Sequence, residues 1–399
     1  MEATTPSRRS PDGTDARPAA ADRIGRALRI RTVVPDAVGD GIRLYGIAAA
    51  QTRSQAARPT TWSTVADVDT DPRHVDVVHA HLTDRTVEEH PDEWAALLGP
   101  RRPDDATFLV ATVHDVPEEA EGRERSARRA ARLVDLCQHV DLVIVSSEHE
   151  RRGAAAIGIA TAVVPHPLPT GGVVAPGASD GRSFGSRHRR PNSLTIAGFV
   201  HPGKGIVELL DAIGDVRGSS LDGWQLRLVG GHVADHDDYL DRVAERCARF
   251  GLAVHHTGAV DDRRWADELR SATIPVAPHL HCSASGSMLA WAAHSRRPFV
   301  SDIPFARELS DERPDAVSLV DAPGGWRKAL TAAATSHDPC RFDPAGWRTA
   351  IGAVDRLDAL IGAAWLDRRS PTATVGGRRA GANRPPRVAV PAAGREMAS

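Results

Sequence analysis

The chain has 399 residues, which is enough for two domains with substantial cores, because single domains usually hold roughly 100 to 200 residues. Its formal net charge at pH 7 is -2, and 26% of its residues are charged. A nucleic-acid-binding protein would normally carry a strong basic excess on its folded part. The composition therefore argues against nucleic acid as a partner and favours small molecules.

The cysteines are spread widely along the chain, at Cys137, Cys247, Cys282 and Cys340. They form neither a Cys-x-x-Cys pair nor a dense framework, so they fit a reducing cytosol. The N-terminus lacks the apolar run of a secretory signal, and no apolar stretch approaches the roughly 20 residues needed to span a bilayer. We therefore expect a cytoplasmic protein.

Both ends of the chain are expected to be disordered. Residues 1–26 form a polar leader rich in proline, arginine and aspartate. Residues 367–399 hold seven arginines among proline, glycine and alanine, with almost no large apolar residue to enter a core. This basic tail could touch nucleic acid or anionic lipid, the latter at most as a peripheral membrane contact; a solvated extension is the plainer interpretation.

The first half of the chain alternates strands with helices. Strands are predicted at residues 28–34, 75–79, 108–113 and 142–145, with an alanine-rich helix after the turn Gly39-Asp40-Gly41 and another helix at 125–137. Polar groups follow the strands, as in His79-Ala80-His81 and His114-Asp115. Short, continuously apolar strands of this kind indicate a parallel sheet covered on both faces.

The second half repeats this rhythm after a linker rich in glycine, proline, serine and arginine at residues 169–191. Strands are predicted at 194–198, 226–230, 253–257, 274–277 and 299–301, and helices at 206–216, 239–250, 262–270 and 287–294. The sequence therefore predicts two Rossmann-like domains, 27–168 and 192–345, followed by a C-terminal helix at 346–366. Ligands of such sheets bind beyond the carboxyl ends of the strands, here in a cleft between the domains.

The turn between strand 194–198 and helix 206–216 is typical of an anion site. Gly203 and Gly205 let the backbone approach an anion closely, the helix start presents free N–H groups, and Lys204 adds a positive charge. An ordinary strand-to-helix turn with a solvated lysine is the alternative.

These segments resemble, in order, motifs of the GT-B glycosyltransferases, particularly the large retaining family numbered four. Gly198, Lys204 and Gly205 stand at the places of its first glycine turn, LRLVGG at 226–231 resembles its second strand, and His256-Thr257-Gly258 resembles the strand end that approaches the nucleobase. Residues 283–302 resemble its donor-clamping loop, helix and strand, which Arg307-Glu308 continues. In the first half, DVVHAH at 76–81, TVHD at 112–115 and VPH at 164–166 resemble the acceptor domain.

The resemblance implies an α/β protein of the GT-B fold whose two parallel sheets face a central cleft. It implies a nucleotide-sugar donor on the second domain, a sugar or natural-product acceptor on the first, and transfer with retention, with no metal and no cofactor. By resemblance the catalytic residues are Lys204 and His114. The donor-binding residues are Gly198, Gly203, Gly205, Gly230, Thr257, Ser283, Ser285, Gly286, Ser287 and Glu308, and the acceptor-binding residues are Asp40, Gly41, His81 and Asp115.

Several of these residues also have a plainer interpretation. His114 could be a satisfied residue at a strand edge, and Asp115 could cap the next helix. Asp40-Gly41 could be a simple turn, and Glu308 a carboxylate at a helix start.

The chain departs from the family at the donor clamp. The family places two glutamates there with seven residues between them, and the matching positions hold Ser283 and Trp291. An indole N–H cannot accept the ribose O–H bonds that a glutamate accepts. Phe199 also replaces an arginine that would share the diphosphate charge. Two interpretations remain: an active transferase that binds diphosphate with Lys204, serine hydroxyls and backbone donors, or an inactive GT-B protein that regulates or scaffolds a partner.

Overall fold

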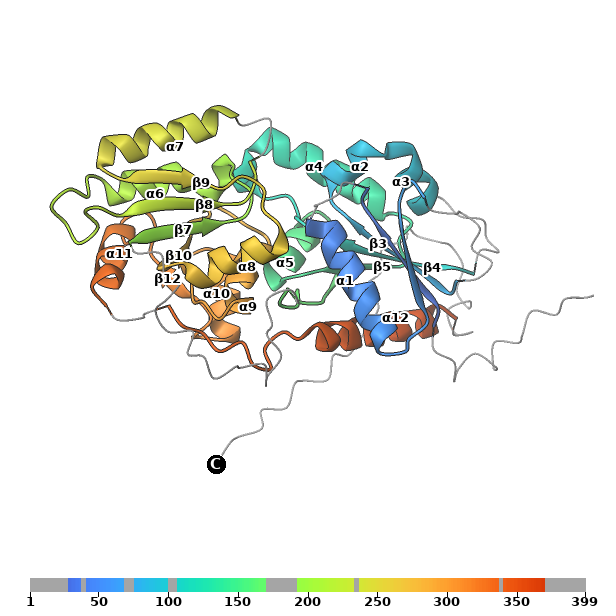
Figure 1. Ribbon diagram of the computed structural model, residues 1–399. Coiled ribbons are helices and arrows are strands. Elements are labelled where there is room, and N and C mark those ends of the chain that lie inside the picture. The colour runs from blue at the N-terminus through green and yellow to red at the C-terminus, as the bar shows by residue number, and fades with distance from the viewer. Residues whose placement is uncertain are drawn as a thin grey trace, which may run out of the picture.

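The computed structural model describes residues 28–36, 41–67, 75–99, 106–169, 192–232, 237–336 and 340–369. The predicted leader, the linker beyond Pro169 and the tail beyond Arg369 lie outside these ranges, as does Asp40. The described residues form two six-stranded parallel sheets, each with its own helices (Figure 1). This arrangement confirms the predicted α/β class with two Rossmann-like domains.

The first domain is built on a sheet with strand order β2-β1-β3-β4-β5-β6. Alternate residues of its strands enter two different cores, because successive side chains point to opposite faces. Val78 of β3 packs in one core with Trp94 and Leu133, whereas Val77 packs in the other with Ile361. The elements are β1 (Ile30–Val34), α1 (Gly41–Gln55), β2 (Thr60–Thr64), β3 (Val77–Leu82), α2 (Asp84–Glu89), α3 (Pro91–Leu98), β4 (Phe108–Val113), η3 (Glu119–Glu121), α4 (Arg123–Cys137), β5 (Leu142–Val145), α5 (Glu148–Ala156) and β6 (Thr161–Val163).

The second domain is built on a sheet with strand order β12-β11-β10-β7-β8-β9. Its largest core packs the apolar face of α6, including Leu209 and Ile213, against β7 and β8. The elements are β7 (Ser193–Ala197), η5 (Pro202–Lys204), α6 (Ile206–Ile213), β8 (Gln225–Val229), α7 (Asp237–Phe250), β9 (Ala253–His256), α8 (Asp262–Ser271), β10 (Ile274–Ala277), α9 (Gly286–Ala293), β11 (Phe299–Ser301), α10 (Pro304–Glu312), β12 (Ser318–Val320), α11 (Trp326–Thr335) and α12 (Ala350–Arg369).

Helix α12 leaves the second domain and returns to the first. Figure 1 shows it beside α1, below the first sheet, and Leu357, Ile361 and Trp365 pack in the first domain's core. An ion pair between the fully buried Arg53 of α1 and Asp358 joins the two helices, with the Nη2 and Oδ1 atoms 2.6 Å apart. The helix spans Ala350–Arg369, whereas the sequence predicted a C-terminal helix at 346–366.

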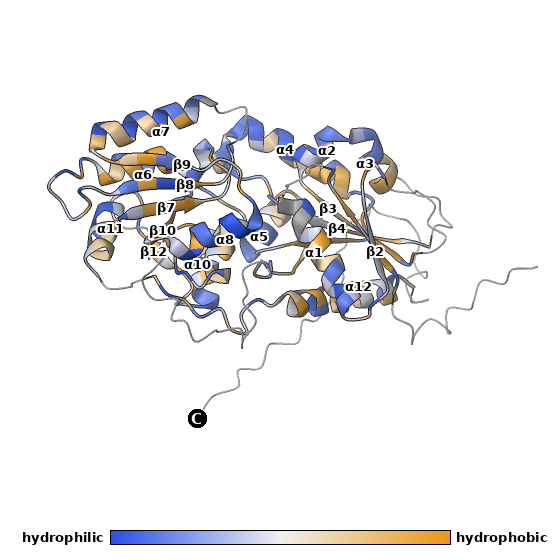
Figure 2. Cartoon of the chain, in the orientation of Figure 1, coloured by the Kyte–Doolittle hydropathy of each residue, from blue (hydrophilic) through white to orange (hydrophobic). Residues whose placement is uncertain are grey.

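Hydropathy follows the layers of the fold. Figure 2 shows mostly hydrophobic strands inside both domains and largely hydrophilic outer faces on helices such as α4 and α7. β3, β4, β5 and β7 are buried at every residue, as expected for parallel strands covered on both faces. None of the described helices combines the length and the apolar composition that crossing a bilayer requires.

The second strand differs from its predicted position. β3 runs from Val77 to Leu82, so His79 and His81 lie inside the strand instead of at its end. The sequence TTWST of β2 was not predicted as a strand, because it has no apolar run. β2 lies at the edge of the sheet and is largely exposed, so strand pairing holds it there without a buried face.

Candidate functional site

The buried ammonium group of Lys204 is at the centre of the second domain's candidate site. The side chain is 5% exposed, and Nζ lies 3.1 Å from the carbonyl oxygen of Ala197, 2.9 Å from Oγ of Ser287 and 3.1 Å from Nε2 of His279. These three acceptors match the three donors of an ammonium group. Burial lowers the pKa of Lys204 to about 8, so the group remains mostly charged at neutral pH.

His279 was missed by the sequence analysis. It follows β10 and is 5% exposed. Burial, followed by the charge of Lys204, holds the pKa of His279 well below its usual range, so the neutral imidazole can accept a hydrogen bond from the ammonium. His114 was singled out because it directly follows a buried strand, whereas Pro278 separates His279 from the end of β10.

Three predicted glycines allow the backbone segments around Lys204 to approach closely. Gly198 has a φ of +100°, and a Cβ atom there would lie 2.9 Å from the Lys204 Nζ. Gly205 has a φ of +67°, and a Cβ atom there would lie 2.1 Å from the carbonyl oxygen of Pro278. Gly230 has a φ of +128°, and a Cβ atom there would lie 2.6 Å from the Gly198 carbonyl oxygen. Side chains at these positions would push apart the turns that enclose the lysine.

Helix α9 begins next to the lysine. Ser285 is its N-cap, and its Oγ accepts a hydrogen bond from the backbone N–H of Met288 at 3.2 Å. The Oγ atoms of Ser285 and Ser287 lie 3.0 Å apart, and Ser287 also accepts from Lys204. Gly286 is exposed, with open space where a side chain would be. The structure therefore brings Lys204, two serine hydroxyls and a helix N-terminus together.

Three other residues of the second domain that were predicted to bind the donor are Gly203, Gly230 and Thr257. A Cβ atom at Gly203 would lie 3.0 Å from the ring of His201, and the Gly203 carbonyl oxygen accepts a hydrogen bond from the Leu280 N–H at 3.1 Å. The Thr257 hydroxyl accepts a hydrogen bond from the Gly230 N–H at 3.1 Å. Phe199, directly after Gly198, is 53% exposed and adds an apolar surface to the turn.

The two positions that lack a glutamate have different environments. Trp291 is fully buried in a core with Val229 and Leu269, so its side chain fills space inside the second domain. Ser283 lies at the contact between the domains, where its Oγ donates to the carboxylate of Glu150 at 2.9 Å. The spacing of residues along the sequence predicted which two positions match the family's glutamates, but it did not predict that Trp291 faces the core.

The first domain carries a histidine cluster, which comprises the buried His79, His81 and His114 and the partly buried His166, with Tyr45. One ring nitrogen of His81 and one of His114 lie 3.2 Å apart, and His114 stacks on His166 with ring centroids 5.1 Å apart. The ring of Tyr45 meets those of His81, His114 and His166 edge to face. Burial holds the pKa of His114 well below its usual range, so its imidazole is neutral at pH 7.

The predicted acceptor and donor residues are only partly brought together. His81 and His114 are in contact, and Asp115 follows β4 with a φ of +73° and an ion pair to Arg129. Gly41 is the first residue of α1. Glu308 lies on α10, where its carboxylate accepts hydrogen bonds from the Glu148 N–H at 2.9 Å and from Arg152 at 3.2 Å.

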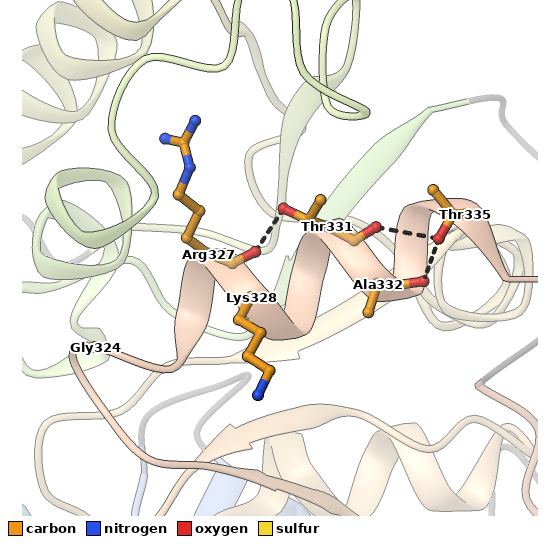
Figure 3. Close-up of a pocket in the computed structure, with 6 residues that line it drawn as sticks. All are labelled: Gly324, Arg327, Lys328, Thr331, Ala332 and Thr335. Atoms are coloured by element: carbon orange, nitrogen blue, oxygen red, sulfur yellow. Dashed lines mark hydrogen bonds between the residues drawn. The ribbon is translucent and has the colours of Figure 1, made fainter.

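No group of three histidine, cysteine, aspartate or glutamate side chains within the described ranges is placed to hold a metal ion. A pocket is found on α11, lined by Gly324, Arg327, Lys328, Thr331, Ala332 and Thr335 (Figure 3). Figure 3 shows Arg327 and Lys328 extending to opposite sides of this helix. None of the predicted site residues lines the pocket, so it does not add to the candidate site.

No protein-family model and no curated protein matches this chain. Solved structures do share its fold. HepE from Anabaena, in complex with UDP and glucose, has a TM-score of 0.56 and 14% identity over 86% of this chain and 98% of that chain. Sucrose-phosphate synthase from Thermosynechococcus elongatus has a TM-score of 0.55 and 15% identity, covering 85% of this chain and 97% of that one.

A third similar structure is AviGT4, a glycosyltransferase involved in avilamycin A biosynthesis. It has a TM-score of 0.52 and 16% identity, and the match covers 85% of this chain and 98% of that chain. Identities this low show likeness of fold. The chain therefore has the GT-B fold of glycosyltransferases such as AviGT4, with two Rossmann-like domains.

Proposed function

We propose that the protein is a glycosyltransferase that moves a sugar from a nucleoside-diphosphate sugar to a sugar or natural-product acceptor, with retention and without a metal ion. The single observation that carries this proposal is the ammonium of Lys204, buried at the carboxyl end of β7 and bonded to the first turn of α9. Burying a charged group costs free energy, so a charge is buried only where other interactions compensate for that cost. A diphosphate is an anion suited to this place.

The chemistry of sugar transfer from a nucleoside diphosphate builds negative charge on the departing diphosphate. Positive charge and N–H donors aimed at that charge lower the barrier, because they are already oriented before the reaction. Ser287 accepts a hydrogen bond from Lys204, so its own O–H is available to donate to a phosphate oxygen. Gly286 adds an exposed helix N-terminus with unpaired N–H groups.

The absence of carboxylates at Ser283 and Trp291 changes what this site would bind. Lys204, Ser285, Ser287 and the start of α9 are donors or can act as donors, which suits phosphate oxygens and supports a metal-free site. We propose that recognition of the ribose is weaker than in relatives that carry a glutamate there, because Trp291 is buried and fills the core.

The first domain is proposed to bind the acceptor. The neutral imidazole of His114 can donate or accept a hydrogen bond at pH 7, and it lies in one cluster with His81. Ser283, in the loop after β10, bonds to Asp115, which follows β4, and to Ser147, which follows β5, so polar residues beyond the strands of the two domains meet. HepE was crystallised with UDP and with UDP-glucose, which makes a uridine nucleotide the first donor to test.

Calorimetry with UDP, GDP and dTDP tests the donor site. The sequence contains only two lysines, Lys204 and Lys328, so Lys328→Ala on α11 is a matched control for Lys204→Ala. We expect saturable binding of one nucleotide to the wild type and to Lys328→Ala, and a loss of at least tenfold in affinity in Lys204→Ala. Binding that is equal in both variants would contradict the assignment of Lys204.

Hydrolysis of nucleotide sugars, measured first without added metal and then with a chelator, tests the reaction. We expect activity in both conditions, and activity that needs magnesium would contradict the metal-free proposal. Failure to bind any of the three nucleotides would instead favour the alternative, a catalytically inactive GT-B protein acting as a regulatory or scaffold partner.

A further inference from the structure

The first turn of α5 connects the two domains through several hydrogen bonds. The Ser147 hydroxyl donates to the carbonyl oxygen of Ser283 at 2.9 Å, and the Glu148 N–H donates to the Glu308 carboxylate at 2.9 Å. Arg152, one turn further on, donates to the same carboxylate at 3.2 Å. Figure 1 shows α5 between the two sheets. This helix terminus therefore contributes several of the contacts between the domains.

Glu150 is the buried carboxylate in this turn. It belongs to no motif and to no characteristic spacing, so the sequence analysis did not single it out. Glu150 is 1% exposed, and its carboxylate accepts three hydrogen bonds. Two come from the first domain, from the Ser146 N–H at 2.7 Å and the Asp115 N–H at 3.2 Å. The third comes from the second domain, from the Ser283 hydroxyl at 2.9 Å.

Ser283 connects this carboxylate to the proposed donor site. It lies two residues before Ser285, the N-cap of α9, and four residues before Ser287, which accepts from Lys204. Its hydroxyl and its carbonyl oxygen both bond to α5, so the loop before α9 is held from two sides. A shift of this loop relative to the first domain would move the start of α9 with respect to His114.

We propose that Glu150 is a positioning residue, which binds the Ser283 hydroxyl across the domain contact and so sets where the start of α9 lies opposite the first domain. This inference rests on the proposed function, because it assigns the position of the donor loop a role in transfer. Glu150 itself touches neither donor nor acceptor. It acts through Ser283, and the nucleotide-binding groups all belong to the second domain.

The contact is expected to depend on pH. Burial raises the pKa of Glu150 to about 7, against hydrogen bonds from Ser146, Ser283 and Asp115 that favour the charged form. A protonated carboxyl would place its own O–H among three donors, so it would bind Ser283 less well. The contact is therefore complete above about pH 7 and weakens below it. The other titratable or charged groups that face this site are Asp115, Arg129, Cys282 and Glu308.

A double-mutant cycle separates this role from a local one. Glu150→Gln keeps the shape of the side chain but removes its charge and one acceptor, whereas Ser283→Ala removes the bonds of the Ser283 hydroxyl across the domain contact, to Glu150 at 2.9 Å and to Asp115 at 3.5 Å. We expect each single variant to lower turnover of a nucleotide sugar at least tenfold and the double variant to be no worse than Glu150→Gln. In Glu150→Gln, UDP affinity should change less than about twofold, because the groups proposed to bind the diphosphate lie on the second domain and Glu150 does not. Multiplying losses in the double variant would overturn the proposal.

Hydrogen exchange gives a readout that does not need activity. The Glu148 N–H bonds to Glu308 of the second domain and not to Glu150. We expect its exchange to accelerate at least tenfold in Glu150→Gln and in Ser283→Ala. Acceleration only at Ser146 and Asp115 would show a local role and overturn the proposal. Should Glu150→Gln fail to fold, Ser283→Ala alone decides this, because it leaves every hydrogen bond of Glu150 within the first domain intact.

Glu148→Gln is the matched control, because this exposed carboxylate on the same turn pairs with Arg151 and not with the second domain. It should leave turnover and its pH profile unchanged. In the wild type we expect turnover to fall below about pH 7, and in Glu150→Gln this acid limb should disappear. An acid limb that persists in Glu150→Gln would contradict the proposal. If no nucleotide binds and no turnover is found, the proposed function fails, and the exchange of the Glu148 amide still tests the domain contact.

Discussion

The buried charge of Lys204 leads to a specific prediction about stability. Replacing it with methionine, which has a similar length and no charge, removes the cost of burying an ammonium group. The pKa falls from 10.5 to about 8 on folding, which corresponds to about 3 kcal/mol at 1.4 kcal/mol per pH unit. Methionine also leaves the Ala197 carbonyl oxygen and the His279 Nε2 without this donor, at a cost of about 1 kcal/mol each. We expect Lys204→Met to be more stable than the wild type by about 1 kcal/mol at pH 7.

The pH dependence of this difference is the sharper test. Below about pH 8 lysine is protonated in both the folded and the unfolded states, so the destabilisation is fully present. Between about pH 8 and 10.5 the unfolded state binds more protons, so wild-type stability rises relative to Lys204→Met and the methionine variant loses its advantage. Urea unfolding of both proteins at about pH 7, 8.5 and 10 measures the change. A difference that is the same at all three pH values would refute this reasoning, as would a Lys204→Met variant that binds UDP normally.

The neutralisation of Lys204 above about pH 8 should weaken UDP binding, with the dissociation constant measured by calorimetry rising severalfold between about pH 7 and 9; a constant value would contradict this. Gly198→Ala, at a φ of +100° and with its Cβ 2.9 Å from the Lys204 Nζ, should lose about 1–3 kcal/mol of unfolding free energy. By contrast Gly362→Ala, with open space around it in α12, should gain about 0.5–1 kcal/mol in the same denaturation assay. Burial lowers the pKa of His166 to about 4, so stability should fall as pH drops from about 6.5, by about 1 kcal/mol at pH 5.5 from this residue. The raised pKa of Glu150 changes stability in the opposite direction as pH falls, so the measurement compares the wild type with His166→Asn. The urea midpoint of His166→Asn should fall less steeply with decreasing pH than that of the wild type. Equal slopes in the two proteins would contradict the prediction.

Much of the fold could be predicted because its strands are short, apolar and separated by helices. β4, β5, β10 and β11 have the predicted bounds, since each is a short, mostly buried run flanked by polar residues or proline. β2 could not be found this way, because an exposed edge strand is specified by its neighbour β1 more than by its own hydrophobicity.

The candidate site likewise has a part that the sequence predicted and a part that it did not. Lys204 and its glycines lie within one short segment, so local pattern was enough to single them out. Glu150 and Ser283 are 133 residues apart, and their hydrogen bond exists only because two domains meet. Burial of Trp291 likewise depends on how α9 packs against its sheet, which spacing along the chain does not encode.

The path of α12 has a practical consequence for dissecting the protein. The first domain consists of two pieces of chain, because residues 350–369 complete one face of its sheet after the whole second domain has been made. A gene fragment that stops at the linker would leave Val77, Phe108 and Val110 uncovered and is expected to yield insoluble material. An isolated first domain should instead be expressed with α12 joined to it by a short linker. The second domain is one continuous piece of chain, so it can be expressed between two boundaries.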